Sequence, residues 1–348
     1  MSIRIIPKSE IDILKLVELL QQGQLLAIPT ETVYGLAANA FDEEAIKKIY
    51  RLKNRPENHP LIIHIAPPKI EDDPSVFWER ELSKWSSDVP PQAIVLAKAF
   101  WPGPLTLILK KSRHVSYFVT GGQTTVGIRV PRHELTIQIL QAFGSGLAAP
   151  SANRFGRISP TSAQHVVEEF SNLMGNESLT ILDGGQCEVG IESTILDLSR
   201  IDQLGPVILR PGMITADDIL AVLGREVSTN LESEIRHSGG VLGHYAPQTF
   251  LISKETDALM EADFMEEKIG VVTFGDVTKL QKKWPTQLVD WYSLPKDANI
   301  VARDLYGLLR DLDSKGYQKI IFDHLPVDLA WSGIKDRLTR AIYGSGKH

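Results

Sequence analysis

Hydrophobic residues form short runs along the first part of the chain, and stretches with helical spacing of apolar residues separate them. The runs predict strands at Leu25–Ile28, Leu61–Ile65, Leu105–Leu109, Val126–Val130, Leu179–Leu182, Thr194–Leu198 and Val207–Leu209. The stretches between them predict helices at Glu10–Gln22, Asp42–Tyr50, His133–Phe143, Ser162–Phe170 and Ala216–Leu223. This alternation is typical of a large α/β domain.

The first predicted helix shows the pattern clearly. Its apolar residues recur at helical spacing and are Ile11, Leu14, Val17 and Leu20. Ser9 is its candidate N-cap, and Gly23 follows its predicted end.

The periodic pattern stops at residues 225–247, where a polar stretch leads into the glycine-rich segment SGGVLGHYAPQ. This composition is typical of a linker. Beyond it, further runs predict strands at Thr249–Ile252, Ile269–Phe274, Val289–Tyr292 and Lys319–Phe322, and an apolar face predicts a helix at Asp297–Asp313. We therefore expect a domain at 1–224, a linker at 225–247 and a smaller α/β domain at 248–348.

The composition is that of an ordinary globular protein. The 348 residues suit two domains, and 43% hydrophobic with 23% charged residues disfavours intrinsic disorder. Lys and Arg number 37 while Asp and Glu number 43, so the net charge of −6 disfavours a dedicated, strongly basic nucleic-acid-binding protein.

Cysteine content and hydropathy indicate the compartment. Cys187 is the only cysteine, which excludes an intramolecular disulfide and a cysteine-rich zinc module. The first ten residues do not resemble a signal peptide, and no uninterrupted apolar stretch of about 18 residues occurs. We expect a cytoplasmic protein with no membrane contact.

Polar residues follow the predicted strands at several points, which is where open α/β sheets bind ligands. The segment PTETVYGL follows the first strand and is either part of a site or a turn whose threonines cap backbone groups.

In the segment KNRP, Pro56 favours an extended Arg55, so Lys53 and Arg55 would point the same way. Two such cations would suit a polyphosphate, and a surface charge pair is the alternative. His59 and His64 follow, and a lone histidine is more often structural than a ligand.

A second pair with the same spacing is neutral. Ser151 and Asn153 follow a short apolar run and a proline, so a hydroxyl and an amide would face one ligand.

Two arginines lie at the ends of apolar strands. Arg129 and Arg210 each need a partner for the guanidinium there. A ligand carboxylate or phosphate would suit the guanidinium, and an internal Asp or Glu would serve equally well.

Absent motifs narrow the chemistry. The chain has no GxGxxG after a strand, no P-loop motif, no HExxH and no GxSxG. The chemistry that these absences leave open is the recognition of phosphate and carboxylate groups by scattered Lys, Arg, Ser, Thr and Asn side chains.

Seven segments match a known family in order. They are PTETVYGLAANA, KNRPENHPLIIHI, WPGPLTLIL, VGIRVPRH, APSANRFGRISPT, GIESTILDL and ILRPG. Together they resemble the YrdC/Sua5 family, and the extra C-terminal part joined through HYAP is similar to the longer Sua5 type.

This resemblance implies the fold and the activity. The fold would be a twisted mixed sheet flanked by helices around a concave active-site cavity, with a smaller Rossmann-like α/β domain after it. The activity would be that of an L-threonylcarbamoyladenylate synthase, which combines L-threonine, bicarbonate or CO2, and ATP with Mg²⁺ into threonylcarbamoyl-AMP and pyrophosphate. That reaction is the first step of t6A modification at position 37 of tRNA.

The resemblance also assigns residues to the site. The catalytic signature falls on Lys53, Arg55, Ser151 and Asn153. The L-threonine pocket falls on Thr32, His64, Arg129, Ala149 through its backbone, and Ser193. ATP binding falls on Arg55, His59, Thr125, Ser151, Ser159, Arg210, His244 and Tyr245. Because His244 and Tyr245 would help cover the nucleotide, the resemblance also implies that the 225–247 linker acts as a lid. His59 departs from the family, which usually has asparagine there.

Partners and an alternative function complete the expectations. The resemblance implies delivery to a downstream t6A transferase machinery and a weak tRNA contact. A YrdC-like RNA-binding module without its own turnover is the alternative. Basic and acidic side chains nearly balance over residues 1–211, so an extended phosphate-binding surface is not evident.

Overall fold

The computed structural model describes residues 2–171, 178–229, 234–260, 263, 267–284 and 287–346. The chain forms two compact units, Met1–Phe155 with Ser159–Gly240 and Gly156–Ile158 with Val241–His348. The segment predicted as a linker is thus divided, with residues 225–240 in the first unit and 241–247 in the second. Its residues 230–233 lie outside the described part.

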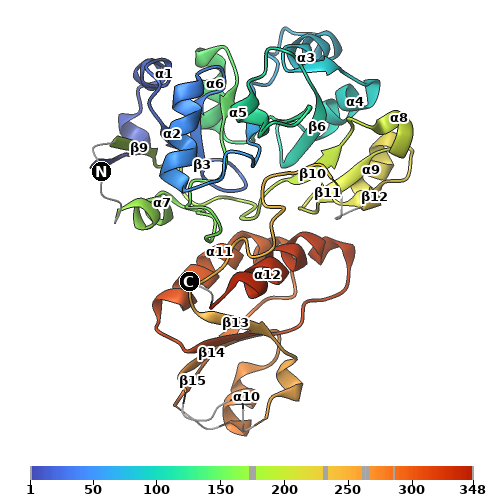
Figure 1. Ribbon diagram of the computed structural model, residues 1–348. Coiled ribbons are helices and arrows are strands. Elements are labelled where there is room, and N and C mark those ends of the chain that lie inside the picture. The colour runs from blue at the N-terminus through green and yellow to red at the C-terminus, as the bar shows by residue number, and fades with distance from the viewer. Residues whose placement is uncertain are drawn as a thin grey trace. The chain divides into compact units, whose positions relative to one another are not determined.

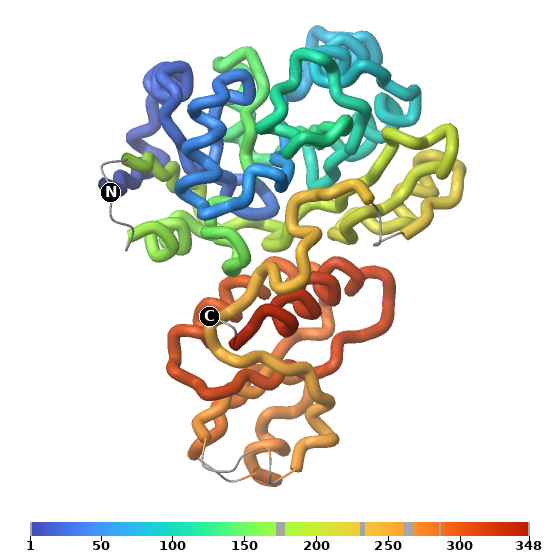
Figure 2. The backbone as a smooth tube through the Cα atoms, in the orientation of Figure 1, coloured from blue at the N-terminus to red at the C-terminus, as the bar shows by residue number. Residues whose placement is uncertain are grey.

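The first unit is built on one mixed sheet (Figure 1). Its strands, in spatial order, are β1 (Ser2–Ile6), β9 (Ser178–Leu182), β2 (Leu26–Ile28), β3 (Gly35–Asn39), β8 (Leu147–Ala148), β4 (Ile62–His64), β7 (Thr125–Arg129), β6 (Leu105–Lys111), β10 (Thr194–Asp197), β11 (Val207–Arg210) and β12 (Ser228–Thr229), while β5 (Ser86–Asp88) pairs with β6. The N-terminal segment lies beside residues 178–182 (Figure 2), because β1 pairs with β9 in parallel. The predicted mixed sheet is confirmed, and each predicted strand is present.

Helices flank this sheet (Figure 1). They are α1 (Ile13–Gln21), α2 (Glu43–Lys53), α3 (Pro74–Ser83), α4 (Pro91–Phe100), α5 (Tyr117–Thr120), α6 (Glu134–Phe143), α7 (Ala163–Phe170), α8 (Ile201–Leu204) and α9 (Ala216–Leu223). The first predicted helix begins later than expected, because Asp12 and not Ser9 accepts a hydrogen bond from the first turn. Leu14 is consequently exposed, and Leu16 is buried in its place.

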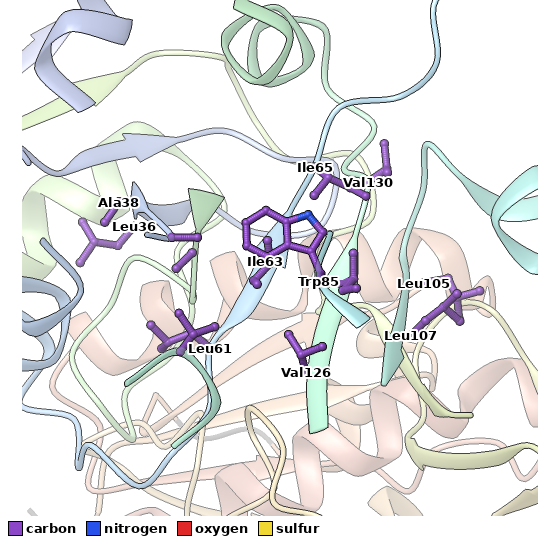
Figure 3. Close-up of a cluster of buried hydrophobic side chains, with 14 of the residues drawn as sticks. Leu36, Ala38, Leu61, Ile63, Ile65, Trp85, Leu105, Leu107, Val126 and Val130 are labelled. Atoms are coloured by element: carbon purple, nitrogen blue, oxygen red, sulfur yellow. The ribbon is translucent and has the colours of Figure 1, made fainter. Parts of the chain in front are cut away.

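The two faces of the central strands carry different side chains, as the two-residue period of a strand requires. Ile63, Leu107 and Ile128 face the main hydrophobic core, which also contains Trp85 (Figure 3). The opposite face carries a smaller apolar cluster that includes Ile62 and Ile108. That second face also carries the polar groups described below.

The second unit has a wholly parallel sheet. Its strand order is β13 (Phe250–Ser253), β16 (Lys319–Phe322), β14 (Ile269–Thr273) and β15 (Val289–Ser293). Its helices are α10 (Val277–Lys283), α11 (Ala298–Ser314) and α12 (Ser332–Gly344), with short 3-10 turns η2 (Thr256–Ala258) and η4 (Leu329–Trp331). The predicted C-terminal α/β domain is present. Among the described residues, no helix combines the length and the apolar character needed to span a bilayer.

Candidate active site

Neighbouring strand ends bring several predicted residues together in the first unit. His64 at the end of β4 is the register partner of Arg129 at the end of β7. Ala149 follows β8, and its amide donates a hydrogen bond to Ile62 O at 3.0 Å. Because side chains two residues apart share a face, Arg129 lies on the same face as Gly127, and His64 on the same face as Ile62.

Arg129 is buried and already has protein partners. Its Nη2 forms an ion pair with Glu31 Oε1 at 2.8 Å and donates to Thr32 Oγ1 at 2.8 Å. The internal carboxylate that the sequence left open as an alternative therefore exists. Arg129 Nε, in contrast, has no hydrogen-bond partner in the part of the chain that the structure describes. Arg129 thus retains a buried donor for a ligand.

His64 adds a neutral ring beside this cation. Its side chain is buried, and Nδ1 lies 3.4 Å from Ile62 O. Burial, and next the charge of Arg129, lower the pKa of His64 to about 3. The imidazole is therefore uncharged at neutral pH and can take part in hydrogen bonds without adding positive charge.

Ser193 and Arg210 form a second polar group on adjacent strands. Arg210 ends β11, and its Nη2 donates to Ser193 O at 2.9 Å and to Ser193 Oγ at 3.2 Å. Ser193 Oγ also lies 2.8 Å from Thr106 Oγ1 on β6. Arg210 Nη1 donates to Ser238 O at 2.9 Å. Arg210, which is assigned to ATP, and Ser193, which is assigned to threonine, are thus linked by hydrogen bonds.

The Lys53–Arg55 geometry differs from the prediction. Helix α2 continues to Lys53, and Asn54 caps it in the left-handed conformation (φ 48°, ψ 45°), so the two cations do not follow an extended two-residue period. Both are buried rather than surface charges, with exposures of 1% and 6%. Arg55 donates to His59 O at 3.3 Å and to Pro60 O at 2.8 Å.

Lys53 holds the loop that carries the neutral pair. Its Nζ donates to Ser151 O at 2.5 Å and also to Asn153 O. Its own carbonyl accepts from Phe155 N at 2.7 Å. Burial, and next the charge of Arg55, hold the pKa of the Lys53 ammonium well below its ordinary value. One member of the predicted cationic pair, Lys53, therefore contacts the backbone of both residues of the neutral pair.

Ser151 and Asn153 occupy different environments in this loop. Ser151 is half-buried and forms an isolated bridge with Gly35, where β3 begins. Asn153 is fully buried, and its Nδ2 donates to Arg154 O at 2.7 Å. Ser159, farther along, donates to Glu192 Oε1 at 2.6 Å. A backbone carbonyl thus holds the Asn153 amide nitrogen, and the expectation that this hydroxyl and amide face one ligand stays a prediction.

Thr125 lies in a small pocket on the same face of the sheet. The pocket is lined by residues 60–62, 108, 123, 125, 127, 195 and 236–238, all of which belong to the first unit. Gly127 keeps this pocket open, because a Cβ there would lie 3.2 Å from Ile108 Cδ1 and 3.5 Å from Ile62 Cγ1.

His244 and Tyr245 belong to the second unit. Tyr245 has φ of 65°, and its ring centroid lies 5.5 Å from that of Tyr306 and 5.6 Å from the Arg337 guanidinium. The His244 and Tyr245 rings make an edge contact at 4.3 Å. Their assignment to ATP stays a prediction.

Comparison with known proteins decides the family. The Sua5/YciO/YrdC family model, described as "Telomere recombination", matches residues 18–212. A model for the threonylcarbamoyl-AMP synthase C-terminal domain matches residues 214–342. The chain belongs to the Sua5/YrdC family.

Relatives of known name agree along nearly the whole chain. The threonylcarbamoyl-AMP synthase of Pyrococcus abyssi is 36% identical over 338 residues, covering 92% of this chain and 91% of its own. That of Bacillus subtilis is 37% identical, covering 94% and 91%. The crystal structure of P. abyssi Sua5 complexed with L-threonine has a TM-score of 0.82 and 33% identity, covering 99% of each chain. The predicted threonylcarbamoyl-AMP synthase activity is confirmed, and the alternative of an RNA-binding module gains no support.

Two residues within the Sua5/YrdC motifs were not assigned from the sequence. Glu31 lies in PTETVYGL and Glu192 in GIESTILDL, and both carboxylates are buried against assigned site residues. Two acidic residues inside motifs rich in hydroxyls were the available signal. A buried carboxylate needs a charged or hydrogen-bonding partner, so a buried Glu31 or Glu192 would require a partner side chain in the site.

Proposed function

We propose that the first unit binds L-threonine and ATP side by side and joins them, with bicarbonate or CO2, into threonylcarbamoyl-AMP and pyrophosphate. The observation that carries this proposal is the buried Arg129, whose Nε has no partner among the described residues, beside the uncharged His64. The naming of the P. abyssi complex with L-threonine supports the same substrate.

The threonine end of the site is assigned to the Arg129 side. Arg129 Nε would donate to the substrate carboxylate, a charge-assisted contact of about 1.5–3 kcal/mol. Thr32, which accepts from Arg129, and the backbone of Ala149 would line the pocket with His64. Ser193 would complete it, since Arg210 holds both its carbonyl and its hydroxyl.

The ATP end is assigned to the Arg55 and Arg210 side. The contributing residues in this unit are Arg55, His59, Thr125, Ser151, Ser159 and Arg210. In the proposal Lys53 acts near the phosphates by holding the 151–153 loop, since its ammonium bonds the carbonyls of that loop. Positive groups at this end would stabilise charge that develops on the phosphorus and the leaving group.

Mg²⁺ is part of the proposal as the companion of ATP. Among the described residues no group of three or more His, Cys, Asp or Glu side chains is placed to hold a metal ion. The oxygen ligands that the protein offers a metal at the ATP end are hydroxyls and the Glu192 carboxylate. This small set fits a Mg²⁺ ion that is coordinated mainly by phosphates and water. When bound, the ion would neutralise charge on the phosphates.

The reaction needs no side-chain nucleophile. The threonine amine attacks carbon dioxide and releases a proton, or attacks bicarbonate with loss of water, and a carbamate results. A carbamate oxygen then attacks the α-phosphorus in line, the bond to the β-phosphate oxygen breaks, and pyrophosphate leaves. The protein contributes position and exclusion of water, which protects the unstable carbamate.

The place of this enzyme in the cell is a further part of the proposal. The product would pass to a t6A transferase machinery, and a weak tRNA contact would accompany that transfer. We place the reaction in the cytoplasm, since the single Cys187 is a free thiol buried in the fold and suits a reducing compartment.

Product detection tests this function. Purified protein with L-threonine, bicarbonate, ATP and Mg²⁺ is expected to give threonylcarbamoyl-AMP by mass spectrometry, with pyrophosphate released in equal amount. Lys53→Ala is expected to abolish pyrophosphate release, because the loop with Ser151 and Asn153 loses its ammonium partner. Lys48→Ala is the matched control, since Lys48 lies on the same helix and donates to Gly23 O at 2.7 Å.

Near-normal turnover of a folded Lys53→Ala variant would refute the role of Lys53. Salt-sensitive RNA binding by wild-type protein without any product would refute the proposed function and favour a binding module. Circular dichroism of both variants verifies that each is folded.

A further inference from the structure

Glu31 lies in a turn whose backbone is fixed from both sides. Thr30 Oγ1 donates to Val33 O at 2.6 Å and accepts from Thr32 N and Val33 N at 3.2 Å, which closes the turn after β2. Glu31 O accepts from Val189 N at 2.7 Å. The position of the Glu31 side chain is therefore set by the fold before any ligand binds.

The Glu31 carboxylate faces two donors inside the protein. Oε1 pairs with Arg129 Nη2 at 2.8 Å, and Oε2 accepts from Arg132 N at 2.9 Å. The side chain has no exposed surface. Because one facing group is a cation held as an ion pair and the other is a backbone N–H donor, a carboxylate suits both, whereas a neutral amide would lose the ion pair.

The ion pair with Glu31 determines which nitrogen of Arg129 can bind a ligand. Nη2 is engaged by Glu31 Oε1 and by Thr32 Oγ1, which fixes the plane of the guanidinium. Nε is left without a hydrogen-bond partner among the described residues, on a side chain only 5% exposed. A buried donor without a partner is costly unless a ligand satisfies it.

We propose that Glu31 is a positioning residue for L-threonine, which holds Arg129 so that Nε meets the substrate carboxylate. This inference rests on the proposed function and adds a residue that does not itself touch the substrate. It also explains why a cation in the substrate pocket has an internal anionic partner. The ion pair fixes the orientation of Arg129, and the substrate carboxylate takes Nε.

The test compares threonine and ATP affinities in one set of full-length variants. Glu31→Gln keeps the size of the side chain but removes its negative charge, and with it the ion pair to Arg129. Glu188→Gln is the control, because this substitution removes one negative charge near the same segment. The Glu188 side chain is exposed and lies 3.4 Å from Arg132 Nη2. Isothermal titration calorimetry with L-threonine alone, and separately with ATP and Mg²⁺, gives the two dissociation constants.

We expect Glu31→Gln to weaken L-threonine binding by at least about tenfold, the scale of one charge-assisted hydrogen bond. ATP binding is expected to stay within about twofold, as is threonine binding by Glu188→Gln, since neither involves the Arg129 orientation. In turnover, KM for threonine is expected to rise more than kcat falls. Glu31→Asp, which keeps the charge but cannot reach both donors, is expected to weaken threonine binding as well, and it serves if the Gln variant does not fold.

Unchanged threonine affinity in a folded Glu31 variant would overturn the inference. Equal weakening of threonine and ATP binding would also overturn it, because a general structural role predicts that pattern. Failure of the wild-type protein to bind threonine would instead remove the proposed function, so the two failures are distinguishable.

Discussion

At the scale of single residues, burial decides the charge that each site group carries. The Arg129 guanidinium pairs with Glu31, whereas His64 next to it is uncharged. The pKa of Lys53 is also lowered, by burial first and by Arg55 second. A site proposed to hold a carboxylate and a triphosphate thus has the Arg129 guanidinium at the acid end, and the uncharged His64 beside it supplies hydrogen bonds.

His64 makes a pH-dependent contribution to stability. Its pKa is about 3 in the folded protein and near 6.5 when unfolded, so between these values the unfolded chain binds the extra proton. Its contribution is fully present above pH 6.5 and is lost as the pH falls toward 3. We expect the unfolding free energy of wild type relative to His64→Gln to fall by roughly 1.4 kcal/mol per pH unit between about pH 6 and pH 4. Urea unfolding at several pH values measures it, and a difference independent of pH would contradict it.

At the scale of elements, the end of α2 organises the proposed phosphate side. The helix ends at Lys53, whose ammonium reaches Ser151 and Asn153 on a distant loop, and Asn54 turns the chain so that Arg55 bonds Pro60 O. One left-handed residue therefore separates two buried cations with different tasks. Helices often end on such a residue, and glycine or asparagine is favoured there.

Substitutions of Asn54 test this helix end. Asn54→Gly is expected to keep stability and pyrophosphate release close to wild type, because glycine adopts positive φ freely. Asn54→Val is expected to cost about 1–3 kcal/mol, since a β-branched residue is strained at φ of 48°. It is also expected to lower turnover by displacing Arg55. Thermal unfolding and a pyrophosphate assay measure both effects, and equal behaviour of the two variants would contradict the role of the turn.

The sequence predicted the regular elements better than the site geometry. The two-residue and helical periods revealed the buried strands, but β3 and β8 consist mainly of glycine, alanine and leucine, which carry no such alternation. The Lys53–Arg55 spacing was interpreted as extended because of Pro56, whereas α2 continues to Lys53. Glu31 was not assigned because its importance lies in a pairing with a residue almost one hundred positions away, which local pattern does not reveal.

At the scale of the whole molecule, the two sheets differ in what occupies their strand ends among the residues that the structure describes. The carboxyl ends of β14 and β16, where parallel sheets usually bind ligands, are occupied by Asp323. Its carboxylate accepts from Thr256 N at 3.1 Å and from Thr273 Oγ1 at 2.9 Å. Burial would raise the pKa of Asp323, but these hydrogen bonds outweigh it and hold the pKa below its ordinary value. An internal anion thus takes the donors that a phosphate would need.

The segment at 225–240 explains why the domain boundary was hard to predict. Arg236 in this segment donates to Asn58 O at 3.0 Å and to Gly121 O at 2.8 Å, and Ser238 O accepts from Arg210. These contacts join irregular backbone to the first unit without any periodic pattern. Its role as a lid stays a prediction.

The most direct test of the central claim is a crystal structure with L-threonine and a non-hydrolysable ATP analogue bound together. We expect the threonine carboxylate within hydrogen-bond distance of Arg129 Nε, and the α-phosphate of the analogue within reach of the threonine amino group on the same face of the sheet. Threonine bound away from Arg129, or the two ligands on separate surfaces, would contradict the account.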